Sequence, residues 1–456
     1  MTRATADVVI CGAGIAGISA AYHLAVERGV GDVALVDDRP PLSLTSDKST
    51  ECYRNWWPGP GRAMVAFMNR SLAWLERLAE ASDNYFGLNR RGYVFLTADA
   101  ERAAAYRPAA EAISALGAGP VRVHERDLSG YRPAPAEGYR GQPDGADLVL
   151  GSELIRQLFP FLAADVAAML QPRRAGWLSA QQLGMWLLER ARAAGVRLLA
   201  DRVSAVRLEK GRVAAVELAS AGRLETRAFV DAAGPLVGEV AKLLGVELPV
   251  FNELHAKLAF NDSLGILPRD LGLMIWDDPI SLAWSAEERE ELAADPEGRR
   301  LLAEFPAGLH FRPEGGPGSR AVLALWTYDL EPQAPAWPPR FDPAYADVVL
   351  RGLGRMAPGL AAYAGRLARP VVDGGYYCKT AENRPLIGPL PVEGAFVIGA
   401  LSGYGVMASQ AAAELLAAHI TGEARPAYAA DFELGRYQRP DYRALLADWQ
   451  ATSGQL

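Results

Sequence analysis

Cysteine, histidine and lysine are all scarce in this chain of 456 residues. Its three cysteines, Cys11, Cys52 and Cys378, are too few and too widely spaced for a disulfide framework or a structural zinc site. The five histidines show neither HExxH nor HxH spacing, so the sequence predicts no metal centre. Arginine supplies nearly all of the positive charge, which makes each lysine a candidate for a special role. The lysines are Lys48, Lys210, Lys242, Lys257 and Lys379.

An excess of positive charge and long apolar runs are missing as well. The net charge of −7 lacks the basic footprint that nucleic-acid binding needs. The most apolar stretch, residues 394–420, is interrupted by Ser402, Gln410 and Glu414, so no transmembrane segment is expected. The N-terminal apolar run contains Asp7 and a glycine cluster, which argues against a signal peptide. We therefore expect a cytoplasmic protein.

The composition favours an ordered chain with more than one domain. Hydrophobic residues make up 50% of the sequence and charged residues 22%, which disfavours extensive disorder. A chain of 456 residues is too long for one ordinary hydrophobic core. Two domains are the simplest expectation.

The N-terminus carries the pattern of a dinucleotide-binding βαβ unit. A buried strand at 6–11 leads into Gly12-Ala-Gly14-Ile-Ala-Gly17, a helix to about residue 28, and a second strand at 33–36. Gly12 suits the tight turn, Gly14 lets the backbone approach a pyrophosphate, and Gly17 lets the helix pack closely on the strand. The pyrophosphate is expected at the helix N-terminus, beside Ile15 and Ala16. The turn thus predicts a dinucleotide cofactor.

Two acidic residues follow the second strand. Asp37 is placed to accept hydrogen bonds from ribose hydroxyls, which disfavours a 2′-phosphate, and Asp38 lies beside it. A polar-to-aromatic loop at 46–57 comes next and has neither helical nor strand periodicity. Further on, helices are predicted at 165–170 and 181–194 and strands at 203–209 and 213–218. Residues 394–423 read as a strand, a glycine-rich turn and a long helix, which form a second cofactor-facing unit.

Four elements together resemble the D-amino acid oxidase-like (DAO) FAD-dependent oxidoreductases. They are GAGIAG with Asp37, the Gly176-Trp-Leu-Ser-Ala segment, VDAAGP ending at Pro235, and NRPLIGPLP followed by VIGALSGYGVMASQAA. The nearest branch is that of sarcosine oxidase, glycine oxidase, and dimethylglycine and proline dehydrogenases. The resemblance covers nearly the whole chain and implies an α/β fold (α+β overall). It implies a Rossmann-like FAD-binding domain at 1–85, 150–245 and 376–456, and a substrate-binding domain with a mainly antiparallel sheet at 86–149 and 246–375.

The resemblance also implies where FAD contacts the chain. Val203 is expected to reach adenine through its backbone, and Ala233 and Gly234 to pass beside the cofactor. The small polar loop supplies Ser49 and Thr50, next to pyrophosphate and flavin. The second glycine turn cradles the flavin with Gly403, Tyr404, Gly405, Val406 and Met407. The position of the family's flavin-linking cysteine falls on Gly375 rather than Cys378, so non-covalent FAD is expected.

On the substrate side, the resemblance places Arg54 where an arginine binds the substrate carboxylate, for which the guanidinium fork is suited. Tyr377 matches an active-site tyrosine on the strand crossing the substrate. Met407 replaces an expected lysine, which favours a bulkier or more apolar substrate than N-methylglycine. His255 and Lys257 alternate on one strand and so share a face. Either could point at the flavin, with Lys257 suited to oxygen activation, or face solvent.

The expected reaction is oxidation of a C–N bond in an amino acid or a secondary or N-methyl amine. Hydride passes to flavin N5, and the resulting imine is hydrolysed. O2 or another electron acceptor then reoxidises the flavin, and an oligomer is possible. One alternative is an FAD-dependent 2-hydroxyacid or polyol-phosphate dehydrogenase, with His255 as its base. Another is a flavoprotein subunit of a larger electron-transfer complex, while an NAD-only dehydrogenase is disfavoured by the C-terminal unit.

Overall fold

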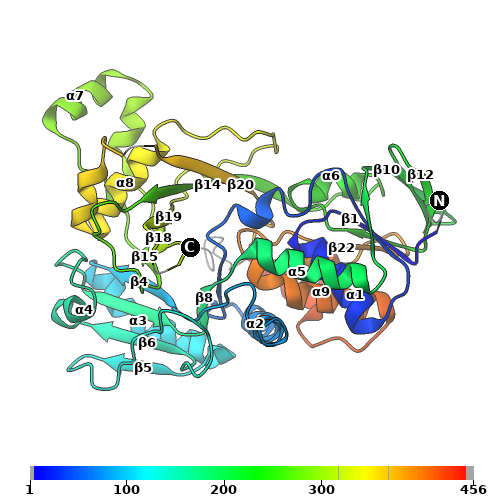
Figure 1. Cartoon of the computed structure of the whole chain (residues 1–456), viewed down its shortest axis with the longest axis horizontal. Helices are drawn as coiled ribbons and strands as arrows, with labels where there is room; N and C mark the ends of the chain where they lie inside the picture. The colour runs from blue at the N-terminus through cyan, green and yellow to red at the C-terminus, as the bar shows by residue number, and fades with distance from the viewer. Residues whose placement is uncertain (1–4, 317, 368, 448–456) are drawn as a thin grey trace.

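Two large β-sheets organise the chain, one in each half of the molecule (Figure 1). The computed structural model describes residues 5–316, 318–367 and 369–447. None of the described helices is long and apolar enough to cross a membrane.

The first sheet has six strands and draws them from both ends of the chain. Its order is β21-β22-β13-β1-β2-β9, and every neighbouring pair is parallel except β21 with β22. The strands are β1 (Val8–Cys11), β2 (Val33–Asp37), β9 (Arg197–Ala200), β13 (Ala228–Asp231), β21 (Leu386–Pro389) and β22 (Ala395–Gly399). The predicted Rossmann-like assembly from discontinuous segments is confirmed.

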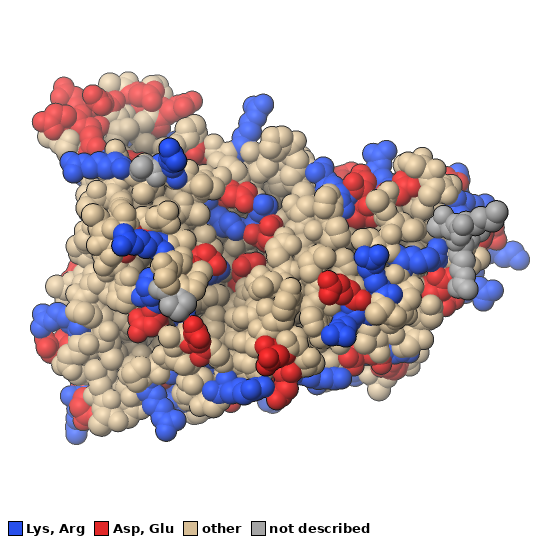
Figure 2. Space-filling view, in the orientation of Figure 1, with Lys and Arg blue, Asp and Glu red and all other residues tan. Residues whose placement is uncertain are grey.

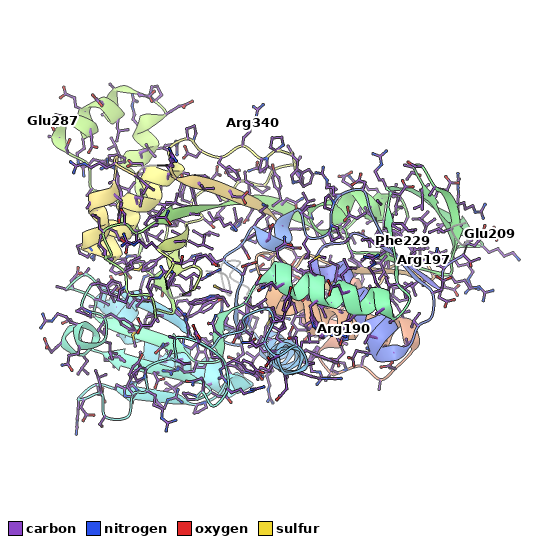
Figure 3. All side chains as sticks on the ribbon, viewed as in Figure 1. Arg190, Arg197, Glu209, Phe229, Glu287 and Arg340 are labelled. Atoms are coloured by element: carbon purple, nitrogen blue, oxygen red, sulfur yellow. The ribbon has the colours of Figure 1, made fainter. Side chains whose placement is uncertain are left out.

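Side-chain alternation along the strands gives this sheet two covered faces. Val8 and Ile10 of β1 pack among helices, while Val9 packs toward a smaller three-stranded sheet. The helices are α1 (Ile15–Arg28), α2 (Ala63–Ala81), α5 (Ala180–Ala193) and α9 (Gly405–Thr421). The small sheet is β10 (Val203–Glu209), β11 (Arg212–Leu218) and β12 (Gly222–Glu225), with α6 (Val237–Lys242) nearby. Figure 3 shows Phe229 within these layers and Glu209 at their outer edge.

The second sheet has nine strands and is mainly antiparallel, as predicted. Its order is β20-β14-β19-β18-β15-β4-β7-β6-β5, with parallel pairing only between β15 and β4 and between β6 and β5. The strands are β4 (Tyr93–Thr97), β5 (Val121–His124), β6 (Ala146–Leu150), β7 (Ala168–Pro172), β14 (Phe251–Asn261), β15 (Leu273–Trp276), β18 (Leu309–Pro313), β19 (Ala321–Leu325) and β20 (Val371–Lys379).

Helices and short ladders complete this half. The amphipathic helix α8 (Tyr345–Met356) packs its apolar side on the nine-stranded sheet. Helix α7 (Ala286–Ala294) buries no residue, and acidic side chains gather over it in the space-filling view (Figure 2). The other elements of this half are α3 (Ala100–Ile113), α4 (Ser152–Leu158), and the ladders of β3 (Cys52–Arg54) with β8 (Ala175–Trp177) and β16 (Ile280–Ser281) with β17 (Glu304–Phe305). Helix α10 (Pro440–Ala447) lies on the side of the six-stranded sheet, where the Tyr442 hydroxyl donates to Glu382 (3.0 Å) just before β21.

One predicted helix is wrong. Residues 165–170 do not form a helix, because Ala168–Pro172 is strand β7, paired with β4 on one side and β6 on the other. The predicted domain division stays a proposal. By sheet membership, β7 and the whole of β20 lie with the nine-stranded sheet, so the divisions there fall near 172 and 379 rather than at 150 and 376.

Buried histidines predict an acid-sensitive fold. Burial lowers the pKa of His23, His310 and His419 to about 4, whereas histidine in an unfolded chain titrates near ~6.5. The unfolded state therefore binds more protons between these values, and the free energy of unfolding falls as the pH falls through this window. Each histidine contributes a slope of about 1.4 kcal/mol per pH unit. Thermal unfolding at pH 7.5, 6 and 5 measures this, and a constant Tm would contradict it.

Candidate functional site

A large cavity lies where the two sheets approach each other. It has a volume of about 380 Å³ and is bordered by the carboxyl ends of β1, β2, β13 and β22 and by β20. Carboxyl ends of parallel strands are where α/β sheets bind ligands. Most of the predicted cofactor residues line it: Gly12, Gly14, Ile15, Ala16, Asp37, Asp38, Ser49, Val203, Ala233, Gly234, Gly403, Gly405 and Val406. Of the other four, Gly17 packs beneath the turn, and Thr50, Tyr404 and Met407 line a neighbouring smaller cavity.

The glycine turn after β1 has no room for side chains. Gly12 has a φ of 111°, and a Cβ there would lie 2.4 Å from the carbonyl oxygen of Ala232. A Cβ on Gly17 would lie 1.9 Å from the carbonyl oxygen of Gly12. Gly14, at the N-cap of α1, has no side chain to cap the helix, and Ser46 Oγ accepts from Ile15 N–H (3.0 Å). The N-terminus of this helix borders the cavity, where its positive end suits an anion. The packing therefore fits a cofactor pyrophosphate.

Asp37, at the end of β2, lines the same cavity and accepts a hydrogen bond from the glycine turn. Ala13 N–H donates to Asp37 Oδ2 (2.7 Å), and Arg39 N–H donates to Asp37 Oδ1 (2.9 Å). Each carboxylate oxygen keeps a lone pair that can accept a ribose hydroxyl. Burial raises the pKa of Asp37. Several other residues that line the large cavity belong to no motif and were not predicted from the sequence, among them Cys11, Arg39 and Leu243.

The turn between β22 and α9 also lines the cavity. Ala400 and Ser402 have φ values of 51° and 48°, a conformation that non-glycine residues seldom adopt. A Cβ on Gly403 would lie 2.3 Å from the ring of Tyr377, so only glycine fits against this tyrosine. Tyr404 caps α9 without a side-chain hydrogen bond. The positive end of α9 can thus stabilise negative charge on a bound group.

The smaller cavity, of about 60 Å³, adjoins the large one, because Ser49, Tyr377 and Gly403 line both. Its other lining residues come from β3, β4, the nine-stranded sheet and the α9 turn. They are Thr50, Cys52, Arg54, Trp57, Tyr93, His255, His310, Leu325, Thr327, Tyr404 and Met407. The predicted substrate residues Arg54, His255 and Tyr377 are therefore brought together here.

Arg54 is the cation of this cavity. Its side chain is buried, with the guanidinium carbon 4.6 Å from the centre of the Trp57 ring and 5.4 Å from that of Tyr93. Arg54 Nε donates to the carbonyl oxygen of Trp56 (3.0 Å). Burial lowers the pKa of this guanidinium because it removes water from the charged form. An anion bound beside Arg54 would offset that desolvation cost.

His255 uses both of its ring nitrogens within the protein. Its Nε2 donates to Glu253 Oε2 (3.0 Å), and the Thr327 hydroxyl donates to Nδ1 (2.9 Å). Burial lowers the pKa of His255, and the imidazole stacks on Tyr377 with ring centroids 4.0 Å apart. Lys379 Nζ also donates to Glu253 (2.8 Å). The role of His255 as a base gains no support from this arrangement, because neither nitrogen is open to the cavity.

His310 is among the residues of the small cavity that sequence reasoning missed, with Tyr93, Leu325 and Thr327. It lies on β18, and its Nδ1 donates to the carbonyl oxygen of Gly308 (2.8 Å). Burial lowers its pKa to about 4, so the ring is neutral near pH 7 and Nε2 carries a lone pair. Nε2 makes no hydrogen bond to a described residue and is not among the fully buried unpartnered atoms. The alternation of His310 and Arg312 in a buried strand is the signal that could have marked it.

Lys257 and Trp56 lie outside both cavities. Lys257 Nζ donates to the carbonyl oxygens of Asp47 (2.8 Å) and Ser49 (3.2 Å), and burial lowers its pKa. Nothing in this geometry supports oxygen activation by Lys257. Of the two tryptophans after Arg54, only Trp57 lines the small cavity.

Comparison with known proteins agrees with this geometry. A curated relative, sarcosine oxidase subunit beta from Rhizobium meliloti, is 26% identical over 261 residues, which cover 56% of this chain and 55% of the relative; the match thus spans about half of each protein. Among solved structures, L-proline dehydrogenase from P. horikoshii aligns with a TM-score of 0.72 at 17% identity, over 95% of this chain and 98% of that one.

Two more solved structures share the fold. Glycine oxidase from Geobacillus kaustophilus aligns with a TM-score of 0.70 at 16% identity, over 94% of this chain and 98% of that one. Iminodiacetate oxidase from Chelativorans sp. BNC1 aligns with a TM-score of 0.67 at 20% identity, over 93% and 98%. The DAO family of FAD-dependent oxidoreductases matches residues 7–419. With FAD as the family's cofactor and a cavity built to hold it, the chain belongs to the DAO family of FAD-dependent oxidoreductases.

Proposed function

We propose that this enzyme oxidises a C–N bond in a small amino acid or secondary amine that carries one carboxylate. The observation that carries the proposal is the buried guanidinium of Arg54 in a cavity that adjoins the cofactor cavity. The relatives named as acting on sarcosine, glycine, proline and iminodiacetate support the amine class. FAD, when bound, supplies the two-electron oxidant.

The carboxylate of the substrate is held by Arg54. A guanidinium offers a planar fork of donors to a carboxylate, and such pairs are the stronger kind of hydrogen bond. The rings of Trp57 and Tyr93 hold the guanidinium in place and exclude water, which strengthens its attraction for an anion. Met407 lines the same cavity, so an apolar surface stands where the family's lysine is expected.

The amine of the substrate is oriented by His310. His310 lines the cavity that also holds Arg54, and its Nε2, which makes no hydrogen bond to a described residue, accepts an N–H of the substrate. The carboxylate and amine are thus fixed at two points, which restricts the orientation of the carbon between them. His255, held by Glu253 and Thr327, supports the ring of Tyr377. FAD is held non-covalently, since burial raises the pKa of the Cys378 thiol to about 12 and keeps it unreactive.

The test is the visible spectrum of the purified holoprotein, followed anaerobically during additions of N-methylglycine, proline, glycine, L-lactate and glycerol 3-phosphate in turn. Bleaching of the flavin band by an amino acid supports the proposal and nominates the substrate. Bleaching by lactate or glycerol 3-phosphate alone would replace it with the hydroxyacid or polyol-phosphate alternative. A flavin band that none of these compounds bleaches would contradict the proposal and favour the subunit alternative.

Replacing His310 tests the second contact. We expect His310→Phe to lower kcat/KM by about 10- to 100-fold, because a lost hydrogen bond to a buried group costs roughly 1–3 kcal/mol. His310→Gln keeps an acceptor and should recover part of the loss. The wild-type kcat/KM should show no ionisation of His310 above pH 5, given its pKa of about 4. Equal values for the wild type and His310→Phe would remove this residue from the site.

A further inference from the structure

We propose that Arg312 is a positioning residue for substrate binding, which acts by fixing the backbone of residues 49–51 beside the small cavity. Arg312 lies on β18, two residues after His310, and neither cavity is lined by it. It acts from the nine-stranded sheet on a loop that leads out of the six-stranded sheet. This inference rests on the proposed function, because its effect is on the site assigned to the substrate carboxylate.

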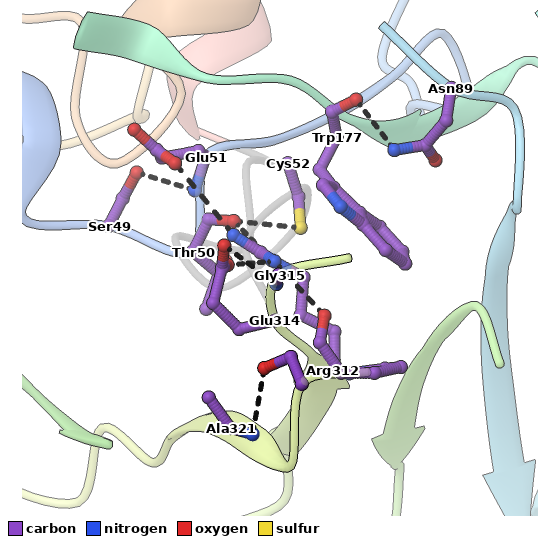
Figure 4. A network of polar contacts seen from close by, with 12 residues as sticks. Ser49, Thr50, Glu51, Cys52, Asn89, Trp177, Arg312, Glu314, Gly315 and Ala321 are labelled. Atoms are coloured by element: carbon purple, nitrogen blue, oxygen red, sulfur yellow. Dashed lines mark hydrogen bonds and ion pairs between the residues drawn. The ribbon is translucent and has the colours of Figure 1, made fainter. Parts of the chain in front are cut away.

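The contacts of Arg312 converge on this loop (Figure 4). Its Nε donates to the carbonyl oxygen of Thr50 (2.7 Å), which also accepts from Cys52 Sγ (3.3 Å). Its Nη1 pairs with the Glu314 carboxylate, and Nη2 lies 3.8 Å from Glu51 Oε2. The side chain is 1% exposed, so a shift of the loop would leave the buried Nε–H without its acceptor, while Glu314 still pairs with Nη1.

The loop adopts a conformation that needs such support. Glu51 has a φ of 57°, in the left-handed region that a non-glycine residue enters at a cost. Its N–H donates to Ser49 Oγ (3.0 Å), and its carboxylate accepts from Ala180 N–H (2.9 Å) at the start of α5. Leu178 N–H donates to the carbonyl oxygen of Glu51 (3.3 Å), and Arg312 adds a restraint on the residue directly before the strained one.

Lys257 restrains the same loop just before Thr50 in the sequence, by donating to the carbonyl oxygens of Asp47 and Ser49. Two cations of the nine-stranded sheet, the buried Arg312 and the half-buried Lys257, thus hold three carbonyl oxygens of residues 47–50. With the carbonyls drawn toward these cations, Thr50 and Cys52 are fixed where they line the small cavity. Arg54 follows in the same strand, β3, so the position of its guanidinium depends on the loop before it.

The chain offers a matched control. Trp177 lies between two arginines, with the guanidinium carbons of Arg312 and Arg91 each 5.0 Å from its ring. Arg91 donates to the carbonyl oxygen of Arg269 (2.7 Å) and, within the described part of the chain, makes no hydrogen bond or ion pair with residues 47–52. Replacing either arginine with glutamine removes a cation from the same tryptophan, but only Arg312→Gln releases Thr50.

The experiment measures two dissociation constants for each variant. FAD affinity is measured by quenching of flavin fluorescence, and acetate affinity by the change that acetate causes in the flavin spectrum of the holoprotein. We expect Arg312→Gln to weaken acetate at least tenfold and FAD less than threefold, and Arg91→Gln to change both less than twofold. Arg312→Lys, which keeps a charge and a donor, should fall between Arg312→Gln and the wild type. With an amine substrate, KM should rise more than kcat falls.

Equal effects of Arg312→Gln and Arg91→Gln would overturn the inference and leave Arg312 as a packing partner of Trp177. An unchanged acetate affinity in Arg312→Gln would overturn it as well. If Arg312→Gln does not fold, as judged by its thermal transition, Arg312→Lys carries the test: a wild-type acetate affinity in that variant would contradict the role. If the wild type itself binds no acetate and no amine reduces its flavin, the proposed function fails, and that result is distinct from a failure of Arg312 alone.

Discussion

Replacing Arg54 with methionine should lower kcat/KM for a carboxylate-bearing amine by about 10²- to 10³-fold. Removing one partner of a buried, hydrogen-bonded charge pair costs roughly 2–5 kcal/mol, and the expected loss corresponds to about 3–4 kcal/mol, in the middle of that range. The guanidinium is buried between Trp57 and Tyr93 and has little water to compensate for a lost carboxylate. Stopped-flow reduction of the flavin over a range of substrate concentrations measures the effect.

Two comparisons make this result specific. Arg54→Lys keeps the charge but loses the planar fork, so it should retain more activity than Arg54→Met. The methyl ester or amide of the same substrate lacks the carboxylate, so it should react about equally with the wild type and with Arg54→Met. If Arg54→Met slows the ester as much as the acid, the arginine supports the fold of the cavity and does not bind the carboxylate.

Replacing Gly12 with alanine should weaken FAD binding by about 100-fold or more. An L-residue at a φ of 111° is strained by about 1–3 kcal/mol. The added Cβ would also lie 2.4 Å from the backbone oxygen of Ala232, which no side-chain rotation can relieve. β1 and β13 must then separate at the edge where the cofactor is held. Flavin content after purification and titration of the apoprotein with FAD measure the loss.

Gly31→Ala is the matched control for Gly12→Ala. Gly31 lies in the loop between α1 and β2, has no positive φ, and a Cβ there would meet nothing within 4 Å. Its FAD affinity should remain within about twofold of the wild type, since a substitution away from special sites changes little. Retention of a full complement of FAD by Gly12→Ala would contradict the placement of the pyrophosphate at this turn.

The cofactor side of the molecule could be predicted because its determinants are local. Gly12, Gly17 and Asp37 lie within one βαβ unit, where strand, turn and helix spacing restrict the geometry. The second glycine turn is similarly local, and Gly403 is required there by a ring from β20. Sequence and structure therefore agree best where few residues separate the parts of a site.

The substrate side depended on packing that no short segment specifies. Alternation places His255 and Lys257 on one face of β14, but it cannot show that a loop from the other half lies over Lys257 and takes its hydrogen bonds. His310 is unremarkable in sequence because its neighbour Gly308, its tautomer and the nearby Arg54 come together only in the folded sheet. At 165–170, the short apolar segment is compatible with either a helix or a strand. It forms a strand because it pairs with β4 on one side and β6 on the other.

The placement of β22 between β13 and β21 has a consequence for synthesis of the protein. β13 pairs with β1 on one side, but its partner on the other side is β22 (Ala395–Gly399), which is synthesised more than 160 residues later. Ribosomes add about 5–20 residues per second, so this edge stays unpaired for seconds after it emerges. An open strand edge is a template for association with other chains. The nascent protein is therefore most exposed to misassembly just before it can bind its cofactor.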